Sequence, residues 1–323
     1  MSDLAPLAEG VAVDPLVGHP ADYHVFHKFI ERCKNLPAIT TAVVWPLSDV
    51  ALKGTVEAAV EGLIEPTLIG DEAAIKALAV KIGVDVSAYP ILDCESERKA
   101  AELGVAMCRS GNAQAMMKGS LHTDELMKAA MKADTGLRTE RRISHVYLMQ
   151  TDHYPKPLLI ADAAINITPN LEDKRDIVQN AIDLARALGI LIPRVAILSA
   201  VKTVSPDIRS TLDAAALCKM ADRGQITGGV LDGPLAFDNA VSLDAARAKG
   251  IVSAVAGRAD ILVAPDLEAG NMLAKQLVYL ADADMAGIVM GARVPIMLTS
   301  RADGTLARLG SAAIALLWAR RPN

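Results

Sequence analysis

Short apolar runs rich in β-branched residues alternate with longer stretches of helical periodicity along most of this chain. Each run ends at Gly, Pro or a polar residue, and the next stretch begins at a capping residue such as Ser48 or Asp71. This alternation predicts a mainly parallel sheet covered by helices, because parallel strands need a crossover connection. We expect strands at 38–45, 65–70, 89–92, 113–117, 194–198, 228–231, 260–264, 287–290 and 294–298. We expect helices at 24–34, 49–61, 72–82, 95–109, 123–132, 172–188, 206–222, 237–248, 268–281 and 303–319.

The alternation is interrupted near the middle of the chain. Two candidate strands, 143–150 and 157–161, follow each other with only the turn at Asp152–Tyr154 between them, which predicts a hairpin. We place a domain boundary near residue 150. Residues 1–150 together with 293–323 are expected to form one subdomain, and residues 151–292 the other.

Composition fits such a fold and narrows the range of functions. Hydrophobic residues make up 52% of the 323 residues but aromatic residues only 3%, so small aliphatic side chains must fill the interior. The net charge is −5, and no basic stripe is interleaved with aromatic residues. Nucleic acid is therefore not expected as a partner, because binding the phosphate backbone needs clustered Lys and Arg.

The ends of the chain and its cysteines indicate a cytoplasmic protein. The four cysteines, at positions 33, 94, 108 and 218, form no CxxC pair and suggest reduced thiols. The first residues show no basic segment followed by an apolar one, so we expect no signal peptide. No apolar run reaches the length of about 18 residues that a membrane span needs, so no membrane association is expected.

The segment Pro295–Gly304 carries the strongest candidate site. An apolar strand ends there, Thr299, Ser300 and Arg301 form a turn, and a helix follows from about Asp303. Polar side chains between a strand end and a helix N-terminus favour an anion, and the guanidinium fork of Arg301 suits phosphate. The competing interpretation is a capped helix with an exposed arginine.

Three further segments contain candidate binding residues. After the strand at 113–117, Lys118, Ser120 and Thr123 can cradle phosphate, or form only a glycine turn followed by a helix capped by Thr123 or Asp124. Asp266 and Asn271, after the strand at 260–264, can hydrogen-bond a ribose, an adenine or an amide, although capping explains Asp266 equally well. Arg138 belongs to a basic run at 136–145 that either holds the phosphates of a nucleotide tail or is a solvated loop.

Several common catalytic signatures are missing. The chain has no GxGxxG after a strand, no GxxxxGK[ST], no HExxH and no GxSxG. Their absence argues against a dinucleotide-binding dehydrogenase of that type, a P-loop NTPase, a zinc peptidase and an α/β-hydrolase. His145 and His153 are too isolated in the sequence to predict a metal site.

Taken together, these segments resemble the phosphate acetyl/butyryltransferase family over about residues 38–320. The pieces that carry the resemblance, in their order and spacing, are MKGSLHTDELMKA at 117–129, GLRTERRISHV at 136–146, VAILSAV at 195–201, LDGPLAFDNAV at 231–241, PDLEAGNMLAKQL at 265–277 and PIMLTSRADG at 295–304. The resemblance implies two α/β/α subdomains with a cleft between them, like isocitrate and isopropylmalate dehydrogenases, usually in a homodimer.

The same resemblance implies a reaction and its residues. It implies reversible transfer of an acetyl or butyryl group between coenzyme A and inorganic phosphate, with no metal or other cofactor in the chemical step. Ser300 and Arg301 match the family's catalytic pair. Asp303 is either the candidate base or an N-cap that orients Arg301. Substrate or CoA binding is expected at Lys118, Ser120, Thr123, Arg138, Ser199, Asp266, Gly270 and Asn271.

Two positions depart from the acetyl-specific pattern. Ala307 stands where acetyl-type members carry an acid, and Leu126-Met127-Lys128 stands where they carry Leu-Arg-Pro. These departures leave the acyl length and the identity of the base open. Two other classes also stay open at this point: a metal- and NAD-dependent decarboxylating dehydrogenase of similar fold, and a non-catalytic CoA-binding protein.

Overall fold

The computed structural model describes residues 25–298 and 304–321. The strands are β1 (Ile39–Val44), β2 (Ile64–Gly70), β3 (Ile91–Asp93), β4 (Ala115–Lys118), β5 (Ser144–Gln150), β6 (Leu158–Ala161), β7 (Arg194–Leu198), β8 (Val230–Leu235), β9 (Ile261–Val263), β10 (Asp284–Met290) and β11 (Ile296–Met297). The helices are α1 (Val25–Cys33), α2 (Asp49–Val60), α3 (Glu72–Ile82), α4 (Glu97–Arg109), α5 (Thr123–Ala130), α6 (Leu171–Ala187), α7 (Arg209–Asp222), α8 (Phe237–Val241), α9 (Leu243–Ala248), α10 (Leu267–Leu280) and α11 (Thr305–Ala319). The predicted alternation is confirmed, with most boundaries within a few residues.

Side-chain caps explain where many helices begin. Ser48, Asp71 and Ser96 each accept a hydrogen bond from a backbone N–H in the first turn of α2, α3 and α4. The single helix predicted at 237–248 was wrong, because the chain leaves the helical conformation at Ser242 (φ −119°, ψ 118°). Ser242 then caps α9 by accepting from the Ala245 N–H, so two short helices replace one.

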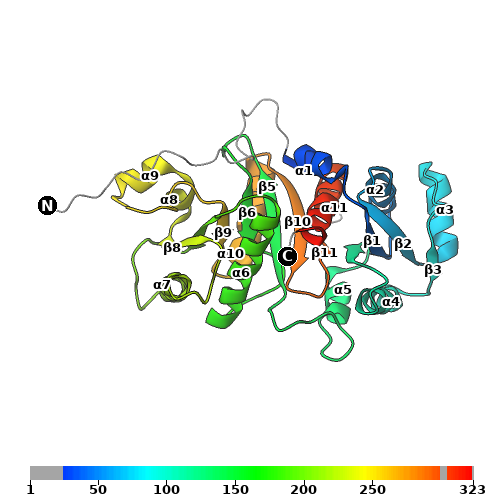
Figure 1. The fold of residues 1–323 in the computed structure, drawn as a ribbon, viewed down its shortest axis with the longest axis horizontal. Helices are drawn as coiled ribbons and strands as arrows, with labels where there is room; N and C mark the ends of the chain where they lie inside the picture. Colours follow the sequence, from blue (N-terminus) through cyan, green and yellow to red (C-terminus); the bar gives the residue numbers. More distant parts are fainter. Residues whose placement is uncertain (1–24, 299–303, 322–323) are drawn as a thin grey trace.

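All the described strands belong to one sheet of 11 strands, in the order β3-β2-β1-β4-β11-β10-β5-β6-β9-β7-β8 (Figure 1). Neighbours are parallel on both flanks of the sheet. The three central pairings, β11–β10, β10–β5 and β5–β6, are antiparallel, and the last confirms the predicted hairpin. An odd number of antiparallel pairings reverses direction, so β6, β9, β7 and β8 run opposite to β1, β2, β3, β4 and β11.

Helices cover both faces of this sheet, as predicted from the alternation. On one face the core is built by α1, α2, α3, α6, α7 and α11. The opposite face carries two separate hydrophobic clusters, one under α4 and α5 and one under α8, α9 and α10. On this second face, the helices therefore form two separate groups instead of one continuous layer.

The closing helix packs near the centre of the molecule. Helix α11 contacts the helices α1 and α2 and the strands β10 and β11 (Figure 1). The division into residues 1–150 with 293–323 and residues 151–292 stays a prediction, because the sheet itself is continuous. Among the described helices, none is long and apolar enough to cross a membrane.

Candidate active site

The strand that leads to the predicted catalytic turn lies in the middle of the sheet, beside β4. Met297 in β11 is the parallel partner of Met117 in β4, so Leu298 leaves β11 next to Lys118. Ser300, Arg301 and Asp303 lie outside the described residues, and their roles stay predictions. The described part of the chain resumes at Gly304, which is the N-cap of α11.

The turn after β4 is fastened to the end of β1. The backbone N–H and the hydroxyl of Ser120 both donate to the Trp45 carbonyl, at 2.8 and 3.0 Å. A Cβ at Gly119 would lie 2.3 Å from the same oxygen, so only glycine permits this approach. Lys118 is only 3% exposed, and its Nζ lies 3.4 Å from the Gly119 carbonyl oxygen. A buried cation is therefore held at the edge of the sheet from which β11 also departs.

Helix α5 begins without the side-chain cap that its sequence predicts. Its N-cap is His122, which makes no capping hydrogen bond, and Thr123 and Asp124 are the first two helical residues. Thr123 is half-buried and lies three residues after Ser120, at the end of the Lys118–Ser120 turn. The prediction that Thr123 or Asp124 caps the helix was wrong, and the proximity of Thr123 to Ser120 follows from the short connection.

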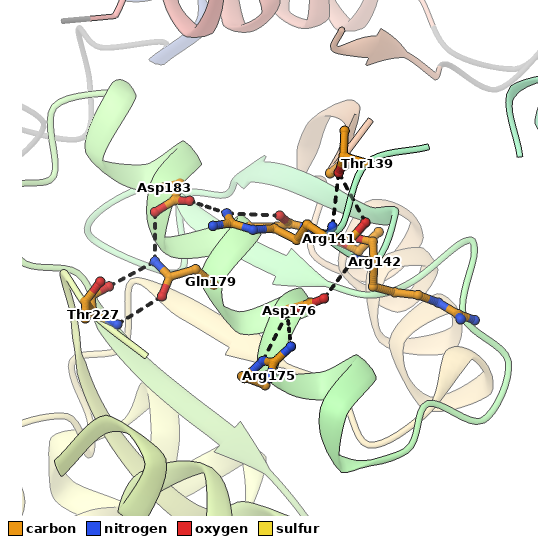
Figure 2. Close-up of polar contacts among 11 residues, drawn as sticks. Thr139, Arg141, Arg142, Arg175, Asp176, Gln179, Asp183 and Thr227 are labelled. Carbon is orange, nitrogen blue, oxygen red and sulfur yellow. Dashed lines mark hydrogen bonds and ion pairs between the residues drawn. The ribbon is translucent and has the colours of Figure 1, made fainter. Parts of the chain in front are cut away.

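The basic run is a paired network rather than a free anion site. Figure 2 shows Arg141 paired with Asp183 and the backbone N–H of Arg142 donating to Asp176, both on α6. The guanidinium of Arg142 donates to Asn166 at 2.7 Å and lies 3.3 Å from Asp173. These contacts tie the 138–142 loop to α6.

Arg138 differs from the other arginines of this loop. It is exposed, and among the described residues it has no ion-pair partner. It lines a surface cavity of about 360 Å³ between this loop and the first turns of α6. Of the arginines in the run, Arg138 is the one whose charge is available to an anionic ligand.

The candidates at the start of α10 have structural partners. Asp266 caps the helix by accepting from the Ala269 N–H at 2.8 Å. A Cβ at Gly270 would lie 2.5 Å from the Asp162 carbonyl oxygen, so glycine lets the helix approach the chain after β6. Asn271 donates to the Ala163 carbonyl at 3.0 Å. These residues brace the segment that follows β6.

Ser199 lies far from the β4–β11 edge. It follows β7, is nearly buried, and its hydroxyl is 2.8 Å from that of Ser210. Six strand spacings separate β4 from β7 in the sheet order, which corresponds to roughly 30 Å at about 4.8 Å per spacing. Lys118 and Ser199 therefore cannot contact the same reacting atom.

Comparison with known proteins identifies the family. The chain matches the family described as phosphate acetyl/butaryl transferase over residues 95–316. It is 55% identical to a phosphate acetyltransferase of Rhizobium meliloti, over 94% of this chain and 96% of that one. The chain belongs to this family.

Two further relatives agree with this membership. A phosphate butyryltransferase of Clostridium acetobutylicum is 39% identical over 91% of this chain and 98% of its own length. The crystal structure of a branched-chain phosphotransacylase from Enterococcus faecalis superposes with a TM-score of 0.76 and 28% identity, covering 88% of this chain and all of that one. The resemblance seen in the sequence motifs is confirmed, and membership favours acyl transfer over the dehydrogenase alternative.

The structure of this phosphotransacylase fold also shows buried polar residues at the central strands that the sequence motifs did not single out. Asp162, directly after β6, accepts from the N–H groups of Ala164, Ile165 and Asn166 at 2.9–3.2 Å. Burial raises the pKa of Asp162, and hydrogen bonds from these neighbours and from the His145 backbone oppose that rise. An Asp directly after an apolar strand was the sequence signal that could have found it.

His145 on β5 is the second buried group that sequence reasoning missed. It is fully buried, and burial lowers the pKa of its imidazole to about 3, against a smaller raising effect of the Leu298 carbonyl. The imidazole is therefore neutral at physiological pH. Among the described residues, no group of three or more His, Cys, Asp or Glu is arranged to hold a metal ion.

Proposed function

We propose that this protein transfers an acyl group reversibly between coenzyme A and inorganic phosphate. The observation that carries the proposal is the 55% identity to a phosphate acetyltransferase over nearly the full length of both chains. The position of Lys118 beside the end of β11 supports it, because an anionic substrate needs a cation near the predicted turn.

The chemistry assigned to the turn follows from the charges that develop. A phosphate oxygen attacks the thioester carbonyl, a C–O bond forms, and the C–S bond then breaks to release the CoA thiolate, which takes up a proton. Ser300 and the amides at 299–304 would stabilise the negative carbonyl oxygen of the intermediate, while Arg301 would hold the phosphate in line. In the reverse direction the CoA thiol must lose a proton, and Asp303 is the candidate base.

We propose acetyl-CoA as the preferred substrate, with overlapping use of propionyl- and butyryl-CoA. The more similar relatives are named acetyltransferases, whereas Ala307 stands where acetyl-type members carry an acid. One methylene discriminates by only about 1–3 kcal/mol, so a gradual decline with acyl length is expected. A preference for acetyl-CoA over butyryl-CoA beyond about a thousandfold would contradict this tolerance.

We further propose a cytoplasmic homodimer that binds the CoA phosphates at Arg138 and needs no metal in the chemical step. The free charge of Arg138 beside the cavity at 138–142 supports that role. Light scattering on the purified chain tests the dimer. Activity that disappears with EDTA and returns with a divalent cation would contradict the metal-free step.

The central experiment is a kinetic comparison of variants at the predicted turn. CoA release from acetyl-CoA is measured with and without phosphate, in the absence of metal and NAD. Arg301→Ala is expected to lower kcat by roughly 10²–10³-fold, and Arg301→Lys to recover part of the loss because a point charge lacks the planar fork. Ser300→Ala is expected to lower turnover while nearly preserving CoA affinity.

Arg247→Ala is the matched control, since within residues 25–298 and 304–321 Arg247 pairs only with Asp244 on α9, at 3.7 Å, with both side chains largely exposed. Circular dichroism confirms folding of each variant. An Arg301→Ala enzyme that is folded and retains wild-type turnover and phosphate affinity would refute the assignment.

A further inference from the structure

Leu298, the residue that follows β11, lies beside Gly287 of β10, and its backbone N–H donates to the Gly287 carbonyl at 3.4 Å. A Cβ built on Gly287 would lie 2.7 Å from the Leu298 carbonyl oxygen and 2.8 Å from His145 Nε2. Both atoms thus occupy the space that a side chain at position 287 would take. Glycine is required here so that the Leu298 carbonyl and the imidazole of His145 can lie next to each other above β10.

The strand pairing explains why these three residues meet. Gly287 is the antiparallel partner of Tyr147 on β5, so its missing side chain would stand on the face that carries His145 and Tyr147. The His145 ring contacts the Tyr147 ring edge-on, with centroids 4.2 Å apart. On the other side, the Gly287 N–H donates to the buried hydroxyl of Ser311 on α11 at 3.1 Å. These contacts hold Gly287 and the His145 ring in place beside the Leu298 carbonyl.

His145 has unused hydrogen-bonding capacity at this place. Its exposed fraction is 0%, and neither ring nitrogen makes a well-aligned hydrogen bond with a described residue. A buried polar group of this kind calls for an explanation, because leaving it unpaired is costly. A neutral imidazole has one donor and one acceptor nitrogen, and Nε2 is the nitrogen that shares the space over Gly287 with the Leu298 oxygen.

We propose that His145 is a positioning residue for acyl transfer: its Nε2–H holds the Leu298 carbonyl and so sets the direction in which the chain leaves β11 toward Ser300 and Arg301. The proposal rests on the proposed function for the reaction concerned. The role needs a neutral ring. Two titratable groups lie next to His145: the ring of Tyr147 contacts the imidazole, and the carboxylate of Asp162 accepts a hydrogen bond from the His145 backbone. His145 itself takes no part in proton transfer.

The tautomer of His145 tests the proposal without any activity measurement. In the full chain labelled with ¹⁵N-histidine, long-range ¹H–¹⁵N correlation spectra assign each ring, and loss of one signal set in His145→Gln identifies this residue. The expected result is a neutral Nε2–H tautomer that does not change between pH 5 and 8. An Nδ1–H tautomer, or a titration within that range, would overturn the proposal.

Kinetics on matched variants separate positioning from simple filling of the core. His145→Leu removes the donor and keeps the bulk, whereas His145→Gln keeps an N–H near the position of Nε2. We expect His145→Leu to lower kcat about a hundredfold, as for a misplaced reacting group, with KM for acetyl-CoA nearly unchanged. His145→Gln should stay within about tenfold of the wild type. Equal losses in both variants, or none in either, would overturn the proposal.

Two additional variants complete the experiment. His153→Gln, at an exposed histidine in the turn between β5 and β6, is the control for the same substitution and should keep wild-type kinetics. In Gly287→Ala the new methyl group would displace the Leu298 carbonyl, so this variant should also lower kcat more than it raises KM. A wild-type kcat in this variant would count against the proposal. An inactive wild-type enzyme would refute the proposed function instead, while the tautomer measurement would still stand.

Discussion

Because His145 is buried in its neutral form, the free energy of unfolding of this protein should fall as the pH is lowered. The pKa of His145 falls from 6.5 in the unfolded chain to about 3 in the folded one, with burial as the main cause. Between these two values the unfolded chain binds a proton that the folded chain does not. Acid therefore favours unfolding, and the stability associated with neutral His145 is present above pH 6.5 and is lost as the pH falls.

The size of this effect follows from the two pKa values. One pH unit within the window corresponds to about 1.36 kcal/mol, so lowering the pH from 7.5 to 5.0 should reduce the free energy of unfolding by about 2 kcal/mol through His145 alone. For a chain of 323 residues this corresponds to a decrease in Tm of about 3 °C.

The assay compares the wild type with His145→Gln by thermal and urea denaturation at several pH values from 5.0 to 7.5. Contributions from other titrating groups, Asp162 included, occur in both proteins and cancel in the difference. The variant is expected to lose less stability in acid than the wild type, so that the difference between them shrinks by about 2 kcal/mol toward pH 5. His153→Gln supplies the control, because an exposed histidine should leave this slope unchanged. Parallel pH profiles for the wild type and His145→Gln would show that His145 is not held neutral by burial.

Two further predictions concern packing and buried charge. Gly270→Ala should cost about 1–3 kcal/mol of stability by overpacking, because the new Cβ would lie 2.5 Å from the Asp162 carbonyl oxygen; an unchanged urea midpoint would contradict the close approach. Asp213→Ala should cost about 3–5 kcal/mol, since it leaves Lys174, whose side chain is 7% exposed, without the carboxylate 2.8 Å away. Replacing Lys174 and Asp213 together by Met and Leu should cost less than Asp213→Ala alone, which equilibrium denaturation of both variants can establish.

Local sequence signals predicted the elements of this fold well where the cause is local. Ser48 and Asp71 cap their helices as expected, because an N-cap depends only on a side chain and the next three residues. The same reasoning was wrong for α5, where His122 precedes the first helical turn without a side-chain hydrogen bond. There the fastening of Ser120 to the Trp45 carbonyl, 75 residues away, decides how the chain enters the helix.

The candidate site likewise combines features that the sequence predicts with features that only long-range contacts decide. The sequence named Lys118 and the turn after the last strand as separate candidates, and the parallel pairing of β4 with β11 places Leu298 beside Lys118. Asp266 and Gly270 were expected to bind substrate, whereas the structure gives each a partner within the fold, at the Ala269 N–H and near the Asp162 carbonyl. Their motif alone cannot separate binding from bracing, because both uses require the same residue types.

By itself, the sequence determined the alternating strands and helices, the central hairpin and the family, since periodicity, capping and ordered motifs are properties of neighbouring residues. Only the tertiary structure decided which strands are neighbours, and hence that three antiparallel pairings reverse the second half of the sheet. It also brought His145, Gly287 and Leu298 together from three separate strands and strand ends. Burial and shared space are properties of the folded chain, and no local pattern of residues encodes them.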